Sequence, residues 1–336
     1  MTRDVRRERL RSLMDRLDLG ALLLRGPANF AWYTDGADNR VDHASPVGVA
    51  GIVVTPDGEY VLTDNIEAPR MREEQTPDMQ VVEHPWYEGP TATLRELTGG
   101  AATGGDFVDE DLRNVSAEIA PLRYALDDAA IARYRQLGRD TDAAFDDVMG
   151  TLSPSTGEAE AAASLTAACR QRGMFSPVLL AAGERRMSRY RHPLPADEPL
   201  RGRGMLVVCA ERGGLYANLT RIVQFEESDP ETRRRQTACE NVLNRMREAT
   251  RPGRTLAELF ADCQHFYAEE GFPEGWRDHH QGGTTGYASR ELVASPDIRH
   301  TVEDGYAFAW NPSLVGAKAE ETFLLSDGET VPLTHP

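Results

Sequence analysis

Lysine is almost absent from this sequence of 336 residues. Lys318 is the one lysine, so the other basic residues are arginines, and Lys and Arg together number 37 against 54 acidic residues. The formal net charge is −17 at pH 7. Because a nucleic-acid-binding surface needs an excess of positive charge, the composition excludes nucleic acid as a partner. An acidic surface poor in lysine suits a cytoplasm of high salt, where like charges are screened, although GC-rich codon usage gives the same composition.

Cysteines are few and scattered, and long apolar runs are missing. The four cysteines form no C-x-x-C pair, which argues against a disulfide framework and against a zinc ribbon. No apolar run approaches the ~18 residues that a membrane span needs. The N-terminus is charged at helical spacing and lacks the apolar core of a signal peptide. We therefore expect a cytoplasmic protein with reduced thiols and no membrane partner.

The first third of the sequence alternates helical and strand patterns. Apolar residues between positions 5 and 17 recur at helical spacing, and residues 21–24 form a short apolar run. Residues 47–54 and 60–62 flank a Pro-Asp-Gly turn, which predicts a hairpin. Domains usually contain about 100–200 residues, so the length of this chain fits two domains. We predict an α/β domain over residues 1–124.

The remainder of the sequence begins with long helical patterns and continues with strands. Two predicted helices are followed by two strands, then by two more helices and two more strands. For residues 125–336 we expect an α+β domain in which helices pack against an antiparallel sheet. The predicted helices cover residues 127–150, 157–171, 231–249 and 256–270, and the predicted strands cover residues 205–210, 215–225, 306–312 and 321–325. A loop rich in Gly and His is expected after the last of these helices.

Five motifs stand out in this second region. They are GERRMSRYRHP (183–193), VVCAERGGLYANLTR (207–221), DHHQGGTTGY (278–287), AFAWNPSLVG (307–316) and KAEETFLL (318–325). Their order and spacing resemble the pita-bread peptidase family, which includes methionine aminopeptidase, prolidase, X-prolyl aminopeptidase and creatinase. The segment 27–34 is similar to the start of the family's creatinase-type N-terminal domain. The resemblance implies a creatinase/prolidase-like domain, a pita-bread catalytic domain and a homodimer.

The resemblance also implies a centre of two metal ions, but this sequence lacks most of its acids. Family peptidases use two Asp, one His and two Glu. The first Asp falls in a strand without a carboxylate, Asn218 replaces the second, and Asn311 replaces one Glu. His279 or His280 matches the histidine, and Glu320 matches the last glutamate. Because amides bring no charge to two dications, we expect no ordinary dinuclear centre and no cofactor. A single divalent ion at His280 and Glu320 stays an open alternative.

His192 takes the position of the family's substrate-facing histidine. Imidazole exchanges protons near neutral pH, so the resemblance points to His192 as the proton shuttle in cleavage of a C–N bond. The plain alternative is a histidine at the end of an Arg-rich surface loop. Arg191, from the same segment, could bind a substrate carboxylate or pair with a surface acid. Lys318 lies two residues before Glu320, where its ammonium could pair with that carboxylate or stabilise developing negative charge.

The family's second histidine, expected before a Glu, is absent, and Arg290-Glu291 occupies that region. Glu291 is the candidate residue there. It could act as a base, bind a substrate ammonium, or be an ordinary solvated glutamate. The catalytic residues predicted by the resemblance are His192, His280 and Glu320, and the predicted substrate-binding residues are Asn218, Asn311, Lys318, Arg191 and Glu291.

Two functions fit these residues. One is a hydrolase, similar to X-prolyl aminopeptidase or creatinase, that cleaves an amide or other C–N bond of a small carboxylate-bearing molecule or short peptide without the usual metal pair. The other is a non-catalytic pseudo-peptidase that keeps the cleft and binds a peptide or small molecule.

Overall fold

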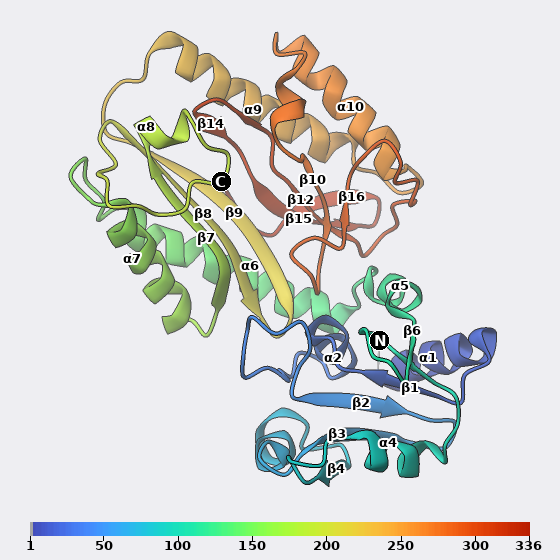
Figure 1. Cartoon of the computed structure of the whole chain (residues 1–336). Coiled ribbons are helices and arrows are strands. Elements are labelled where there is room, and N and C mark those ends of the chain that lie inside the picture. The colour runs from blue at the N-terminus through green and yellow to red at the C-terminus, as the bar shows by residue number, and fades with distance from the viewer. Residues whose placement is uncertain (1–2) are drawn as a thin grey trace. The chain divides into compact units, whose positions relative to one another are not determined.

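The computed structural model describes residues 3–336 (Figure 1). The chain divides into two units, one of residues up to Arg123 with Asp127–Ala129, and one of Tyr124–Leu126 with Ala130–Pro336. Within residues 3–336, every helix is too short or too polar to cross a membrane.

The first unit is built on a mixed sheet of six strands (Figure 1). Across the sheet the order is β4 (Val81–His84), β3 (Glu59–Asp64), β2 (Ala50–Val54), β1 (Ala21–Leu24), β5 (Thr103–Gly105) and β6 (Arg113–Asn114). β1 runs antiparallel to β2 and parallel to β5, so the sheet belongs to the α/β class. The helices are α1 (Arg3–Leu17), α2 (Pro27–Tyr33), α3 (Ala68–Arg70), the π-helix η1 (Met71–Gln75), α4 (Thr91–Thr98), α5 (Ser116–Ile119) and the 3-10 helix η2 (Ala120–Arg123).

Helix α1 packs in this unit through apolar residues spaced three or four apart. Leu10, Leu13 and Met14 are buried, as the helical spacing in the sequence predicts. Arg6 of the same helix is fully buried and donates from Nη2 to Asp35, 2.7 Å away, and to Asp127. Two carboxylates therefore compensate the cost of burying this guanidinium.

The second unit contains two antiparallel sheets and a short strand pair. The first sheet is β7 (Phe175–Gly183), β8 (Arg203–Arg212) and β9 (Leu215–Gln224), and the second, in spatial order, is β11 (Leu292–Val293), β10 (Gly282–Thr285), β12 (Ala307–Trp310), β15 (Glu321–Ser326) and β16 (Glu329–Pro332). The strand pair is β13 (Ser313–Leu314) and β14 (Ala317–Lys318), and the helices are α6 (Asp128–Met149), α7 (Glu158–Gln171), α8 (Glu184–Met187), α9 (Pro230–Ala249), α10 (Leu256–Glu269) and the 3-10 helix η3 (Gly275–Asp278). Helices α6 and α7 lie beside the first sheet, α9 lies beside the second, and α10 packs on α9 (Figure 1).

The two sheets of this unit meet where β9 passes the start of β15. The backbone N–H of Thr220 donates to the carbonyl of Glu320 over 3.3 Å, and the backbone N–H of Asn218 donates to Oγ1 of Thr322 over 2.7 Å. This junction places the motif of residues 207–221 beside the motif of residues 318–325.

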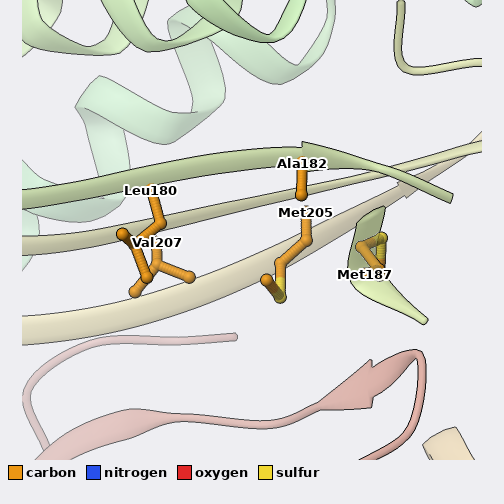
Figure 2. Close-up of a cluster of buried hydrophobic side chains, with 5 residues drawn as sticks. All are labelled: Leu180, Ala182, Met187, Met205 and Val207. Atoms are coloured by element: carbon orange, nitrogen blue, oxygen red, sulfur yellow. The ribbon is translucent and has the colours of Figure 1, made fainter. Parts of the chain in front are cut away.

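An apolar cluster covers one face of the β7–β8 pair (Figure 2). Leu180 and Ala182 of β7 pack with Met205 and Val207 of β8, and Met187 of α8 completes the group. Val207 is 2% exposed. The strand in which the family resemblance places an aspartate thus contributes to a hydrophobic core.

Residues 282–285 form a strand, where the sequence predicted a loop rich in Gly and His. The sequence interpretation was wrong because glycine usually weakens a strand, whereas here the backbones approach too closely for a side chain. Gly282 has φ of +97°, and a Cβ on it would lie 2.0 Å from the carbonyl oxygen of Ala309 on β12.

Candidate functional site

A hollow of about 150 Å³ in the second unit collects most of the residues named above. We call it the histidine pocket. Residues of β7 and β8 form one wall, and polar residues from five other segments form the rest. The lining consists of Val178, Leu180, His192, Val207, Cys209, His280, Ser289, Arg290, Asn311, Lys318 and Glu320.

Three histidines converge at the mouth of this pocket. His192 comes from the loop after α8, and His279 and His280 follow η3. Each has a ring nitrogen within 4.8 Å of those of the other two, and Nε2 of His192 lies 2.9 Å from Nε2 of His279. His279 is buried, whereas His192 and His280 are exposed.

Hydrogen bonds assign the protons of two of these rings. Nδ1 of His279 lies 2.5 Å from the carbonyl oxygen of His280, which can only accept, so Nδ1 of His279 carries the proton. In the neutral ring Nε2 is then an acceptor, and Nε2 of His192 must donate to it. A neutral His192 therefore has its lone pair on Nδ1.

The surroundings keep all three imidazoles neutral at pH 7. Burial, followed by the repulsion that a protonated His279 would meet from His280 and Lys318, lowers the pKa of His279 to about 3. Burial and the charge of Arg290 lower the pKa of His280 to about 4. Burial and Lys318 also lower the pKa of His192. Neutral imidazole is the form that accepts protons and that binds metal ions.

The carboxylate of Glu320 is buried among three donors. It is 2% exposed and accepts from Lys318 Nζ over 2.7 Å, from Arg290 Nη2 over 3.0 Å and from Thr220 Oγ1 over 2.7 Å. Burial alone would raise the pKa of Glu320, but the charges of Lys318 and Arg290 outweigh burial and hold that pKa at about 2. Glu320 is therefore ionised, and two cations surround one anion.

Cys209 lies in the same wall but is no nucleophile. Burial, with the negative charge of Glu320, raises the pKa of its thiol to about 11. Since only the thiolate attacks, Cys209 is inert at neutral pH.

The two asparagines differ in their access to the pocket. Asn311 lines the pocket, and its Oδ1 is buried without a hydrogen-bond partner in the described part of the chain. Asn218 is fully buried opposite Cys209 on the neighbouring strand, and its Nδ2 lies 3.4 Å from Thr285 Oγ1. Asn311 can therefore meet a ligand directly, whereas Asn218 does not line the pocket.

Two predicted substrate-binding residues lie outside the lining. Arg191 donates to Asp278 Oδ2 over 3.0 Å and to the carbonyl of Leu314 over 3.3 Å. Glu291 immediately precedes β11, where its backbone N–H donates to the carbonyl of Thr284. The pocket thus brings together His192, His280, Glu320, Asn311 and Lys318 of the predicted residues, and leaves Asn218, Arg191 and Glu291 outside its lining.

Sequence reasoning missed two partners of Glu320. Thr220 could have been found, because it lies two residues after Asn218 in a strand and so shares its face. Arg290 could have been found from the resemblance, because Arg290-Glu291 occupies the region of the family's second histidine.

Known proteins with similar sequences or structures identify the family. The sequence model of metallopeptidase family M24 matches residues 132–327, and that of the creatinase/prolidase N-terminal domain matches residues 6–123. A search of curated proteins gave no match.

Solved structures of the same fold cover the whole chain. The Xaa-Pro dipeptidase from Bacillus anthracis superposes with a TM-score of 0.84 at 16% identity, over 100% of this chain and 98% of that one. The prolidase from Thermococcus sibiricus has a TM-score of 0.84 at 16% identity, over 100% and 97% of the two chains. The dipeptidase from Pyrococcus horikoshii OT3 has a TM-score of 0.83 at 18% identity, over 98% of each.

These matches confirm the predicted family and fold class, an α/β creatinase-type N-terminal domain followed by an α+β pita-bread domain. The chain belongs to metallopeptidase family M24, the pita-bread family of hydrolases that cleave C–N bonds.

Proposed function

We propose that this protein hydrolyses an amide or other C–N bond of a small carboxylate-bearing molecule in the histidine pocket, without the family's pair of metal ions. One observation carries the proposal. The neutral His192–His279 pair and the positively charged group around Glu320 line or border the same pocket. A proton-transfer group and an anion-stabilising group are the two parts that such a hydrolysis needs.

The donor set of the pocket argues against two dications. Where the resemblance expects the first aspartate, the strand presents Val207 and Cys209 to the pocket. Asn218 and Asn311 are neutral, and both oxygens of Glu320 already accept hydrogen bonds. Two divalent ions would face a single, already neutralised carboxylate. We therefore derive no step through a metal pair.

The charge of the pocket supports an anionic substrate. Lys318 and Arg290 bring two positive charges against the one negative charge of Glu320. The remaining positive charge favours a substrate carboxylate and any negative charge that develops on a carbonyl oxygen during attack. Ligand pockets usually enclose about 300–1,000 Å³, so a hollow of about 150 Å³ fits a small molecule or only the reacting end of a short peptide.

His192 is the proposed proton shuttle. Its Nε2–H donates to His279, which fixes the ring and leaves the lone pair on Nδ1. Nδ1 accepts a proton from water as the water oxygen forms a bond to the substrate carbon. The same proton then passes to the nitrogen as the C–N bond breaks, which releases an amine and leaves His192 neutral. Asn311 Oδ1 can accept a hydrogen bond from the substrate N–H.

One observation favours the second function, a binding protein without turnover. Glu320 is the one carboxylate in the lining of the pocket, and its two cationic partners keep its pKa at about 2, so it is a poor base. If the histidine pair cannot activate water alone, the pocket would bind an anionic peptide or small molecule and leave it intact.

Substrate screening of metal-free protein separates these functions. We would purify the protein in high salt, remove metals with a chelator and test dipeptides, X-Pro peptides, and guanidino and ureido acids. We expect turnover that a chelator does not affect and that His192→Ala lowers by about 10²–10⁴-fold. His265→Ala, at an exposed histidine of α10, is the matched control and should keep full activity.

Each other result has a clear meaning. X-Pro cleavage that requires added metal and is lost with chelator would contradict the proposal in favour of an orthodox family peptidase. Tight binding without turnover, measured by calorimetry on the same compounds, would support the binding protein. Equal turnover in His192→Ala and wild type would remove His192 from the mechanism.

A further inference from the structure

The three histidines at the mouth of the pocket also meet the geometric demands of a metal site. Zinc binds imidazole nitrogen at about 2.0–2.1 Å, and ligands in tetrahedral positions then lie about 3.3 Å apart. Nε2 of His192 and Nε2 of His279 are 2.9 Å apart, and a ring nitrogen of His280 lies within 4.8 Å of both. Shifts of a few tenths of an ångström to about 1.5 Å, mostly in exposed His192 and His280, would bring three nitrogens around one ion.

His279 already has the second hydrogen bond that metal-binding histidines use. A ligating histidine usually donates its other ring N–H to a carboxylate or a backbone carbonyl, which fixes the tautomer. Nδ1–H of His279 donates to the carbonyl of His280, so Nε2 points its lone pair at His192. This tautomer needs no change before a metal ion binds.

Buried hydrogen bonds hold the segment that carries His279. Nε2 of Gln281 donates to the carbonyl of His279 over 2.6 Å, and the hydroxyl of Tyr267 donates to Oε1 of Gln281 over 3.0 Å. Gln281 and Tyr267 are both buried. The position of His279 is therefore set by the core of the unit before any ion arrives.

The donor type decides which ions fit. Three neutral imidazoles suit zinc, cobalt, nickel and copper, whereas magnesium, calcium and manganese prefer oxygen ligands. The positive charges of Lys318 and Arg290 oppose a dication nearby, and Glu320 offsets only one of them. A site of this kind binds one ion with moderate affinity and discriminates against the hard, oxygen-seeking metals.

We propose that His192, His279 and His280 bind a single transition metal ion of the zinc class, at a site that shares only one residue with the family's carboxylate-based ligand set. A further consequence rests on the proposed function. A metal on Nε2 of His192 moves the ring proton to Nδ1, which removes the lone pair that accepts a proton from water. The ion would therefore inhibit hydrolysis.

Cobalt titration tests the site without reference to turnover. We would add Co²⁺ to metal-free protein, follow the visible absorption of the bound ion, and count bound ions by equilibrium dialysis. We expect one ion per chain with the visible bands of a nitrogen-coordinated cobalt, displaced by Zn²⁺ and not by a hundredfold excess of Mg²⁺. His279→Ala and His192→Ala should each weaken binding on the order of 100-fold, and His265→Ala should leave it unchanged.

Two variants keep the test independent of folding defects. If His279→Ala fails to fold, His192→Ala at an exposed position gives the same answer. Asn311→Ala changes a family ligand position outside the histidine group and should bind Co²⁺ as wild type does. Absence of saturable binding, or binding that His192→Ala does not weaken, would overturn the proposal.

Failure of the two proposals can be told apart. If Co²⁺ binds as expected but no compound is hydrolysed, the metal site stands and the proposed hydrolysis fails. If metal-free protein hydrolyses a substrate and no ion binds, the reverse holds. If both hold, stoichiometric Zn²⁺ should abolish turnover and a chelator should restore it. Activation by Zn²⁺ would overturn the inhibitory role.

Discussion

Glu320 shows how a single buried carboxylate determines the charge of the pocket. In water its ionised form would be stabilised by solvent, and here Lys318, Arg290 and Thr220 replace that solvent. Removing one partner of such a buried group costs about 3–5 kcal/mol because the others are left with uncompensated charge. The network therefore stabilises the fold and also forms part of the pocket.

Acid should weaken this network in a defined pH window. The pKa of Glu320 is about 2 in the folded protein and about 4.3 in an unfolded chain. The folded value is the lower one, so the stabilisation is fully present above about pH 5 and is lost as the pH falls toward 2. We expect Glu320→Gln to be less stable than wild type by about 3 kcal/mol at pH 7, and the difference to shrink between pH 5 and pH 2.

Urea unfolding of both proteins across this pH range measures the difference. Groups away from the pocket that titrate in acid are present in both proteins and largely cancel. His192 and His280 interact with the charge of Glu320, so their protonation is part of the measured difference. A difference that stays constant from pH 7 to pH 2 would contradict the assigned role of Glu320.

The sequence predicts the pocket better where its residues share a strand or a segment. Lys318 and Glu320 are two apart, so their pairing follows from the alternation of an extended chain. Arg290 and Glu320 are thirty positions apart, and only the meeting of β10, β12 and β15 brings them together. The His192–His279 pair likewise joins a loop and a segment that no local pattern connects.

At the level of elements, the glycine-rich strand β10 is the least predictable part of the site. Its glycines predict a loop, because glycine, like proline, aspartate and asparagine, is rare in strands. The reason for glycine lies in β12, whose carbonyl at Ala309 occupies the space of a side chain on Gly282. By contrast, α6, α7, α9 and α10 each have a helical apolar periodicity in their own sequence. Their predicted ends therefore agree with the structure to within about one residue.

Gly282→Ala tests this close approach. The added Cβ meets the carbonyl oxygen of Ala309 at 2.0 Å and forces a residue with φ of +97° to carry a side chain. We expect a loss of more than about 2 kcal/mol, because strain and overpacking add. Thermal unfolding should show a lowered midpoint.

Gly328→Ala is the matched control for backbone strain alone. Gly328 has φ of +77°, and a Cβ there would meet no atom within 4 Å. We expect this variant to lose only about 1 kcal/mol. Equal losses in the two variants would mean that the contact with Ala309 is not the reason why position 282 requires glycine.

For the whole molecule, the most prominent property of the sequence is its excess of negative charge, which the folded protein still carries. The net charge of −17 has to be spread over the surface of a monomer or an oligomer. Many arginines pair with neighbouring acids, for example Arg234 with Glu231, but exposed pairs contribute little each. The cytoplasmic location, the homodimer, the residue bounds of the two domains and the halophilic source stay predictions from the sequence.

Salt dependence tests whether the acidic surface is adapted to high ionic strength. Repulsion between the excess acids destabilises the folded chain at low salt, and the screening length falls from about 10 Å at 0.1 M to about 3 Å at 1 M. Screening also weakens the exposed ion pairs, but these contribute little each, so the net charge decides the sign. We expect the thermal midpoint to rise by several degrees between 0.1 M and 2 M KCl.

Potassium chloride is the suitable salt, since sulfate would strengthen apolar burial in any protein. A midpoint that falls or stays level over this range would mean that ion pairing outweighs repulsion and that the acidic composition is no adaptation to salt.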